Sequence, residues 1–312
     1  MNTIGIVGTG HVGAHCAYAL AIQGLADALI LLDTDEKKLR AEVQDLRDST
    51  FYYPHRADIR PGTYSDLRDC DLVVISVGGI TEDENRLSEL RQSDAIIEEC
   101  VPRIVEAGFS GIFLVITNPC DIMAARVREL SGFAPSRVIG TGTGLDSARL
   151  KEVLARELGV SHKSLECFTI GEHGDSQIAP WSCFRIGGQS LERLAAVRPE
   201  VYKKLDRAAV LQEVKRAGWV VFAGKHATEY GIASTLAALV RCILHDEKQV
   251  LPASVWLNGT YGEFGIYAGM LCRVGRQGVE EVYELPLTEE ERRGFQDSCR
   301  IIRENLAALE NS

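Results

Sequence analysis

The chain has no excess of positive charge and no hydrophobic run long enough to cross a bilayer. Its 34 lysines and arginines are outnumbered by 44 aspartates and glutamates, which gives a formal net charge of −10. Surfaces that bind nucleic acids or anionic lipids need a basic face, so we expect neither a nucleic acid nor a membrane as a partner. The N-terminus, MNTIGIVGTGHVG, enters a glycine-rich motif directly, and we therefore expect no signal peptide.

The nine cysteines lack the patterns of a disulfide framework or a zinc site. Their number is odd, no two form a C-x-x-C pair, and most lie in apolar stretches. The seven histidines are scattered without the spacing of metal ligands. We therefore predict buried, reduced thiols, a cytoplasmic protein and no metal site.

The first half of the chain alternates short apolar runs with amphipathic stretches. The runs are continuously apolar, as is typical of parallel strands covered on both faces, and they are 3–8, 28–33, 71–76, 111–117 and 137–142. The amphipathic stretches between them predict helices over 12–24, 36–49, 86–107 and 119–131. Such alternation predicts an α/β fold with an N-terminal Rossmann-type, doubly wound parallel sheet.

The second half of the chain changes character. Helical patterns over 146–158 and over a long stretch around 210–245 are followed by β-rich segments, SVWLNGTYG and GIYAGMLCRVGRQGVEEVYEL, in which Gly275 and Gly278 mark turns. TEEE at 288–291 predicts the start of a C-terminal helix that ends near Leu309. At 312 residues the chain is long enough for two domains. We predict a first domain over 1–143 and a C-terminal α+β substrate domain over 144–312.

The glycine-rich motif GIVGTGHVG supplies Gly8, Gly10 and Gly13 in the spacing G-x-G-x-x-G. Three glycines alone occur in many tight turns. Here, however, the motif follows a predicted strand, opens a predicted helix and precedes Asp33, which ends the next strand. The helix N-terminus can bind a pyrophosphate, and the Asp33 carboxylate can accept hydrogen bonds from a ribose diol and repel a 2′-phosphate. The motif therefore predicts a dinucleotide site that favours NAD over NADP.

Two further polar segments follow buried strands. The segment 78–92, GGITEDENRLSELRQ, has Arg86 at the start of a helix, and TNPCD has Asn118 before a proline. Loops at the carboxyl ends of parallel strands border the ligand crevice. A loop carrying Arg86 can close over a substrate, and Asn118 can contact a cofactor ribose or a substrate oxygen. Taken alone, each segment is also an ordinary polar turn.

The segment IGEHGDSQ places His173 between glycine and acidic residues, and GLDSARL places Asp146 and Arg149 on one face of a helix. A histidine that transfers protons needs a carboxylate to fix its tautomer, and Asp146 can supply it. From spacing alone, a catalyst and a loop histidine are equally good interpretations of His173. Asp146 and Arg149 also fit a plain ion pair within a helix.

Together these motifs resemble the L-lactate/malate dehydrogenase family, in family order and over the full length of the chain. Within the family, FSGIFLVITNPCDI, GFAPSRVIGTGTGLDSARL and ATEYGIAS are most similar to L-2-hydroxyisocaproate dehydrogenases and their L-lactate dehydrogenase relatives. The resemblance implies an NAD-dependent oxidoreductase that acts on a CH–OH group, with NAD bound by the first domain. It also implies a homotetramer or homodimer.

The resemblance implies a role for each matching residue. His173 is the general acid/base, Asp146 orients it, and Arg149 binds the substrate carboxylate. Arg86 polarises the substrate carbonyl, and the substrate-binding residues are Arg86, Asn118, Arg149 and Thr228. The implied cofactor-binding residues are Gly8, Gly10, His11, Val12, Gly13, Asp33, Gly78, Asn118 and Ile232.

The implied reaction is reversible hydride transfer between NADH and a monocarboxylic 2-oxo acid, as in an L-lactate dehydrogenase. A malate dehydrogenase and a non-enzymatic NAD-binding protein are the alternatives. Malate-type relatives use a basic residue on the lid, whereas ITEDEN before Arg86 has none. Ile80 or Thr81 stands at the position that sets substrate preference, and Gly231 suggests a permissive pocket because lactate enzymes commonly carry alanine there.

Overall fold

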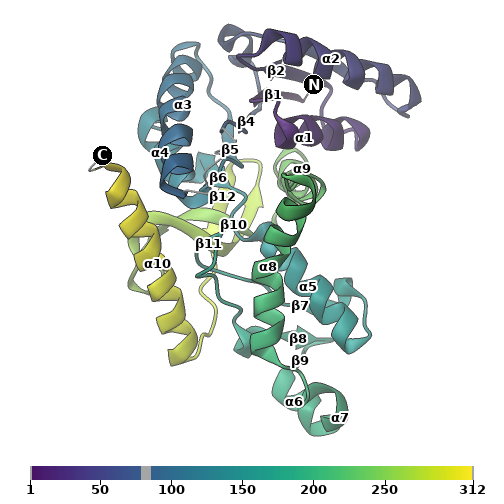
Figure 1. The fold of residues 1–312 in the computed structure, drawn as a ribbon, viewed down its shortest axis with the longest axis vertical. Helices are drawn as coiled ribbons and strands as arrows, with labels where there is room; N and C mark the ends of the chain where they lie inside the picture. Colours follow the sequence, from purple (N-terminus) through teal and green to yellow (C-terminus); the bar gives the residue numbers. More distant parts are fainter. Residues whose placement is uncertain (1, 79–85, 311–312) are drawn as a thin grey trace.

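The computed structural model of the chain describes residues 2–78 and 86–310, and one large sheet runs through it (Figure 1). Its strands are β1 (Thr3–Val7), β2 (Ala28–Leu32), β3 (Asp58–Pro61), β4 (Leu72–Ile75), β5 (Ile112–Val115), β6 (Val138–Gly140), β10 (Gln249–Asn258), β11 (Phe264–Gly275) and β12 (Gly278–Val282). Within the described residues the order is β12-β11-β10-β6-β5-β4-β1-β2-β3. Strands β1 to β6 pair in parallel, and β10 to β12 extend the sheet in antiparallel pairing.

The larger helices are α1 (His11–Ile22), α2 (Glu36–Ser49), α3 (Arg86–Glu106), α4 (Cys120–Ser131), α5 (Gly144–Leu158), α8 (Arg207–Lys225), α9 (Tyr230–Leu244) and α10 (Glu289–Glu310). Figure 1 shows α3 and α4 to one side of the sheet, and α1 packed against α9 to the other. A smaller sheet of β7 (Leu165–Glu166), β8 (Arg185–Ile186) and β9 (Gln189–Ser190) lies beside α6 (Leu191–Val197) and α7 (Pro199–Tyr202).

The apolar runs of the first half form the centre of the sheet. Strands β2, β4 and β5 are buried at every residue, which explains why their sequences are continuously apolar instead of alternating. The predicted α/β fold with a parallel, Rossmann-type sheet is therefore confirmed. Strand β3 lies outside that pattern because its four residues, DIRP, include two charges and a proline, a composition confined to sheet edges.

One sequence prediction is wrong: the stretch around 210–245 is two helices, α8 and α9, and not one. Helix α8 ends at Lys225, and the next residue, His226, has the left-handed φ of 62° that usually belongs to glycine at this position. Neither glycine nor proline marks the break in the sequence KHATEY. The corner 226–229 instead turns α9 onto α1.

Strands from the second half of the chain complete the sheet of the first. Strand β10 pairs with β6 at Ser254 and Gly140, and a Cβ on Gly142 would stand 2.4 Å from the backbone nitrogen of Ser254. The main hydrophobic core accordingly spans both halves, and a smaller core lies between α5, α8 and the small sheet. In the part of the chain that the structure describes, no helix is long and apolar enough to cross a bilayer.

Candidate active site

The glycine-rich turn between β1 and α1 is shaped by close backbone packing. Gly8 has a φ of +93°, and a Cβ on Gly13 would fall 2.0 Å from the carbonyl oxygen of Gly8. A Cβ on Gly10, in contrast, would meet no atom of the described residues within 4 Å, so that part of the chain leaves the space over the middle of the turn open. Among the same residues no side chain caps helix α1 at His11, which leaves the N–H groups of its first turn for an anion. These residues fit a dinucleotide pyrophosphate.

Asp33 follows β2 and lies beside this turn. Its Oδ2 atom accepts hydrogen bonds from the Thr9 N–H (2.7 Å) and the Thr9 hydroxyl (2.9 Å), and Oδ1 accepts one from the Asp35 N–H (3.0 Å). Partial burial raises the pKa of Asp33, but the hydrogen bonds from Asp35 and Thr9 and the charge of Lys38 outweigh it, and the net pKa is lowered. The carboxylate is therefore an anion near neutral pH.

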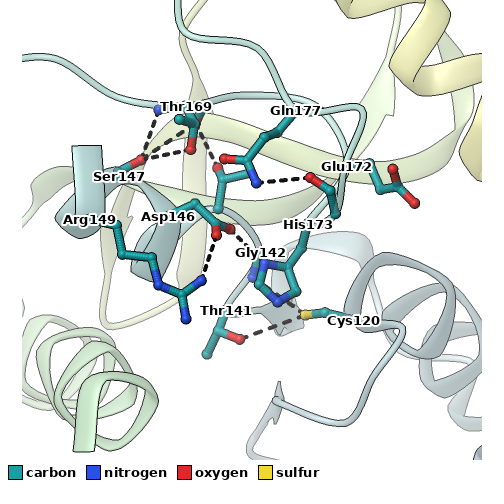
Figure 2. Close-up of polar contacts among 12 residues, drawn as sticks. Cys120, Thr141, Gly142, Asp146, Ser147, Arg149, Thr169, Glu172, His173 and Gln177 are labelled. Carbon is teal, nitrogen blue, oxygen red and sulfur yellow. Dashed lines mark hydrogen bonds and ion pairs between the residues drawn. The ribbon is translucent and has the colours of Figure 1, made fainter. Parts of the chain in front are cut away.

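Asp146 joins two other predicted site residues through one carboxylate. It is in the first turn of α5 and is 2% exposed. Its Oδ2 atom lies 2.6 Å from His173 Nδ1, and its Oδ1 atom accepts a hydrogen bond from Arg149 Nη1 at 3.0 Å. Figure 2 shows the histidine ring and the guanidinium reaching Asp146 from different sides. The helical spacing of Asp146 and Arg149 and the position of the His173 loop thus bring the three groups together.

The charged groups of this cluster stabilise the ionised forms of His173 and Asp146. The negative charge of Asp146 raises the pKa of His173 to about 9, against the opposing effects of burial and Arg149. Burial alone would raise the pKa of Asp146, but the positive charges of His173 and Arg149 lower it overall. Near neutral pH the pair is therefore an imidazolium and a carboxylate. The contact uses Nδ1, so Nε2 is the ring nitrogen available for proton transfer.

The main chain of the His173 loop is fixed by four other elements. The His173 N–H donates to Asp121 Oδ2 on α4 at 2.8 Å, and Ser254 on β10 donates to the other oxygen of Asp121. The Glu172 N–H donates to Ser298 Oγ on α10 at 2.7 Å, and Gly171 pairs with β11. Sequence reasoning missed Asp121 and Ser298 as parts of the site. Only Asp121 carried a signal, because it lies in the TNPCD motif.

Two family models match consecutive parts of the chain. The lactate/malate dehydrogenase NAD-binding domain matches residues 2–140, and the lactate/malate dehydrogenase α/β C-terminal domain matches residues 143–312. The chain belongs to the lactate/malate dehydrogenase family. Membership of this family confirms the predicted NAD-dependent oxidoreductase activity on a CH–OH group and the predicted cofactor, NAD.

Relatives of this lactate/malate dehydrogenase family member match over nearly the whole chain. An L-lactate dehydrogenase of Fusobacterium nucleatum is 46% identical over 97% of this chain and 95% of its own length. L-lactate dehydrogenase 3 of Bacillus thuringiensis is 36% identical over 98% of this chain and 97% of its own length. The ligand-bound crystal structure of a minor L-lactate dehydrogenase from Enterococcus mundtii has a TM-score of 0.94 and 34% identity, covering 99% of this chain and 98% of that one. The predicted type of function, an NAD-dependent L-2-hydroxy acid dehydrogenase like these enzymes, is supported.

Other predicted site residues of this dehydrogenase lie at the carboxyl ends of strands or at the α8–α9 corner. Asn118 is exposed just beyond β5, and Gly78, with a φ of +148°, follows β4. Thr228 lies in the corner between α8 and α9, and Val12 and Ile232 pack partly buried on the main core. Gly78 and Asn118 therefore lie at the same edge of the sheet as the glycine-rich turn. Thr228 and Ile232 lie just before and within α9, which packs against α1.

Some predictions about this dehydrogenase fall on the segment 79–88. Ile80 and Thr81 lie outside the described residues, and so does the side chain of Arg86, although Arg86 begins helix α3. Gly231 is described, and its position gives a different reason for glycine than a permissive pocket. A Cβ there would stand 2.7 Å from the Leu145 side chain, so glycine at this position allows α9 to pack on α5.

Glu229 is a further residue that sequence reasoning missed. It is buried at the start of α9, forms an ion pair with Lys225, and lies 3.0 Å from His11 Nδ1 and 3.7 Å from His15 Nδ1. His11, predicted to bind the cofactor, therefore connects the glycine-rich turn with the corner that carries Thr228. This contact leaves no signal in the sequence, because 218 residues separate its partners.

Proposed function

We propose that the chain reduces monocarboxylic 2-oxo acids to L-2-hydroxy acids with NADH and catalyses the reverse oxidation with NAD. The observation that carries this proposal is the Asp146 carboxylate, which contacts the His173 ring and the Arg149 guanidinium at once. A 2-oxo acid has its carboxylate next to the carbonyl that is reduced. A cation for the carboxylate and a proton donor for the carbonyl oxygen, held side by side, match that chemistry.

Each residue of the site has a distinct role in this reaction. Arg149 binds the substrate carboxylate with its planar, two-pronged guanidinium. The protonated Nε2 of His173 donates its proton to the carbonyl oxygen as C2 is reduced, and Asp146 stabilises the imidazolium before the transfer and fixes the ring afterwards. NADH, when bound, supplies the hydride that forms the new C2–H bond. In the reverse direction neutral His173 accepts the hydroxyl proton.

The remaining roles rest on the family resemblance and on positions in the fold. We assign Arg86 to polarising the carbonyl, and Asn118 and Thr228 to the substrate. The residues assigned to NAD are Gly8, Gly10, His11, Val12, Gly13, Asp33, Gly78, Asn118 and Ile232. The open space over Gly10 and the uncapped start of α1 support this set. We also assign residues 1–143 to the NAD-binding domain and 144–312 to the substrate domain.

Substrate choice tests the proposal. With NADH and a panel of 2-oxo acids, we expect kcat/KM for pyruvate, 2-oxobutyrate and 2-oxoisocaproate to exceed that for oxaloacetate. Glu82, Asp83 and Glu84 in the lid sequence disfavour a second carboxylate, whereas an apolar pocket separates added methylenes by only ~1–3 kcal/mol each. NADH absorbance gives the rates. A preference for oxaloacetate over every monocarboxylate would identify a malate dehydrogenase, and no turnover at all would favour a non-enzymatic protein.

Asp33 is expected to exclude NADPH. Two unit charges 4 Å apart repel by about 4 kcal/mol at an effective dielectric constant of about 20, so kcat/KM with NADH should exceed that with NADPH by at least ~10²-fold. Asp33→Asn keeps the size and removes the charge, and should reduce this preference by ~10-fold or more. Asp48→Asn, an exposed carboxylate on α2, is the matched control and should leave the ratio unchanged. Equal use of both cofactors by the wild type would contradict the assignment.

We propose a homotetramer or homodimer that is located in the cytoplasm. Several large apolar side chains are exposed on α1, α8 and α9, namely Tyr18, Ile22, Trp219, Val220, Phe222 and Tyr230. Ring contacts connect Trp219 to Phe222 and Tyr230 to His15 of α1. An exposed apolar face of this kind supports contact with a second copy. The nine free cysteines support the reducing environment of the cytoplasm.

A further inference from the structure

Asp121 is a buried carboxylate for which the reaction outlined above has no use. It lies in the first turn of α4 and is 3% exposed. One oxygen accepts the His173 N–H at 2.8 Å, and the other accepts the Ser254 hydroxyl at 2.5 Å. Burying a carboxylate is unfavourable unless its hydrogen bonds are satisfied, so a residue held in this way needs a reason.

We propose that Asp121 is a positioning residue for His173: it fixes the main chain of this residue, while Asp146 fixes its ring. This inference rests on the proposed function, because it gives Asp121 a part in placing the group that transfers the proton. His173 is then held at two places, its main-chain N–H and its ring, by carboxylates from α4 and α5. Neither helix alone can set both the position and the tilt of the ring.

The hydrogen-bond pattern explains why a carboxylate, and not an amide, suits this position. The two groups that face Asp121, an N–H and a hydroxyl, both donate to it. A carboxylate accepts both hydrogen bonds through charged oxygens, whereas asparagine has one neutral oxygen for the His173 N–H and can reach Ser254 only as a donor to a reversed hydroxyl. Ser254 comes from β10, so Asp121 also ties the His173 loop to the strand that joins the two halves of the sheet.

The charges around Asp121 show which group it acts on. Burial raises the pKa of Asp121 to about 6, against the two hydrogen bonds and the positive charge of His173, so the group is mostly ionised above neutral pH. The titratable groups that face it are His173 and Glu172 on the loop, Cys120 on α4 and Cys299 on α10. Burial raises the pKa of both thiols, which therefore stay neutral. His173 is thus the cation among the groups that this carboxylate faces.

The charges that face His173 determine the direction in which its pKa is shifted. Asp146 and Asp121 both raise its pKa, and Arg149 lowers it. Reduction of a 2-oxo acid needs protonated His173, so kcat/KM for pyruvate should be flat at lower pH and fall as pH rises through about 9. Removing the Asp121 charge lowers the pKa of His173. The fall should then begin at a lower pH.

The test compares Asp121→Asn with the wild type at saturating NADH. We expect kcat to fall about 10- to 100-fold through misplacement of the imidazole, and the pH at which kcat/KM falls to move down by about one unit. The dissociation constant for NADH, measured by fluorescence titration, should stay within about twofold, because Asp121 does not contribute to the cofactor turn. Asp94→Asn, a buried carboxylate bound to Arg126, is the matched control and should leave the pH profile unchanged.

Two variants of Ser254 separate position from charge. Ser254→Ala removes one donor but keeps the carboxylate, so kcat should fall less and the pH profile should stay in place. In Asp121→Asn/Ser254→Ala the buried amide NH₂ has lost the hydroxyl that could accept from it. We therefore expect kcat to be no higher than in the single asparagine variant, with the pH profile still displaced.

Several results would overturn the proposal. An asparagine variant with the wild-type pH profile would show that Asp121 only stabilises the loop, whatever its kcat. Failure of both asparagine variants to fold would likewise reduce the residue to a structural role. A wild-type chain that turns over no 2-oxo acid would refute the proposed function instead, and this outcome is read from the wild type alone.

Discussion

Replacing His173 with asparagine is expected to lower kcat for 2-oxo acid reduction by at least ~10²–10⁴-fold, the range typical of a lost general acid. Asparagine is smaller than histidine, but its NH₂ group stands near the position of Nδ1 and can still donate to Asp146, so the cluster around Arg149 should stay in place. It cannot supply a proton at the position of Nε2. Steady-state rates from NADH absorbance, with NADH binding measured separately by fluorescence, separate loss of chemistry from loss of the cofactor.

His162 provides the control for this prediction. It is exposed in a short 3₁₀ helix, His162–Ser164, in the loop that follows α5, and His162→Asn should keep the wild-type kcat. Turnover near that of the wild type in His173→Asn would contradict the general-acid assignment. Equal losses in both variants would point to a general loss of folding, which a thermal unfolding curve would reveal.

Replacing Arg149 with glutamine should lower kcat/KM for the 2-oxo acid by roughly 30-fold to several thousand-fold. This range corresponds to the ~2–5 kcal/mol lost when one partner of a buried, hydrogen-bonded charge pair is removed. The loss should appear mainly in KM, because the substrate carboxylate is bound in the ground state as well as in the transition state. Arg149→Lys should recover only part of it, since an ammonium group cannot make the two parallel hydrogen bonds of a guanidinium.

The pH dependence of kcat/KM provides a second test of the role of Arg149. The positive charge of Arg149 lowers the pKa of His173, so its removal should move the fall of kcat/KM above about pH 9 to a higher pH. Arg156→Gln on the same helix is the control, because Arg156 is exposed and pairs with Glu213 on α8. It should leave both kcat/KM and the pH profile unchanged. Retention of wild-type KM for the oxo acid by Arg149→Gln would rule out the carboxylate-binding role.

The features that sequence reasoning predicted are those with a local signal. Continuously apolar runs identified β1, β2, β4, β5 and β6, because burial on both faces acts on every residue of such a strand. The spacing of Gly8, Gly10 and Gly13 predicted the tight turn between β1 and α1, since a Cβ on Gly13 would meet the carbonyl oxygen of Gly8 within the same turn. The contact between Asp146 and Arg149 followed from helix geometry alone.

Features that depend on a neighbouring element gave no such signal. The four residues of β3 form a strand because they pair with β2, and not because of their own propensity. The break between α8 and α9 falls at His226. This residue has a left-handed conformation, but it is not a glycine, so its sequence does not predict a break there. Packing of α9 against α1 decides where that corner lies, as the contacts of Glu229 with His11 and Lys225 illustrate.

By itself, therefore, the sequence determined a parallel sheet, a glycine-rich turn and a set of candidate polar residues, each through interactions within one turn or one strand. It left His173 open between a catalyst and a loop histidine. Only the tertiary structure placed the ring 2.6 Å from Asp146 and its N–H on Asp121, 52 residues away in sequence. The loop that carries His173 is held to the sheet because Gly171 pairs with Gly269 of β11, and β10 joins β11 to β6. Pairings across so many residues leave no periodic pattern in the chain.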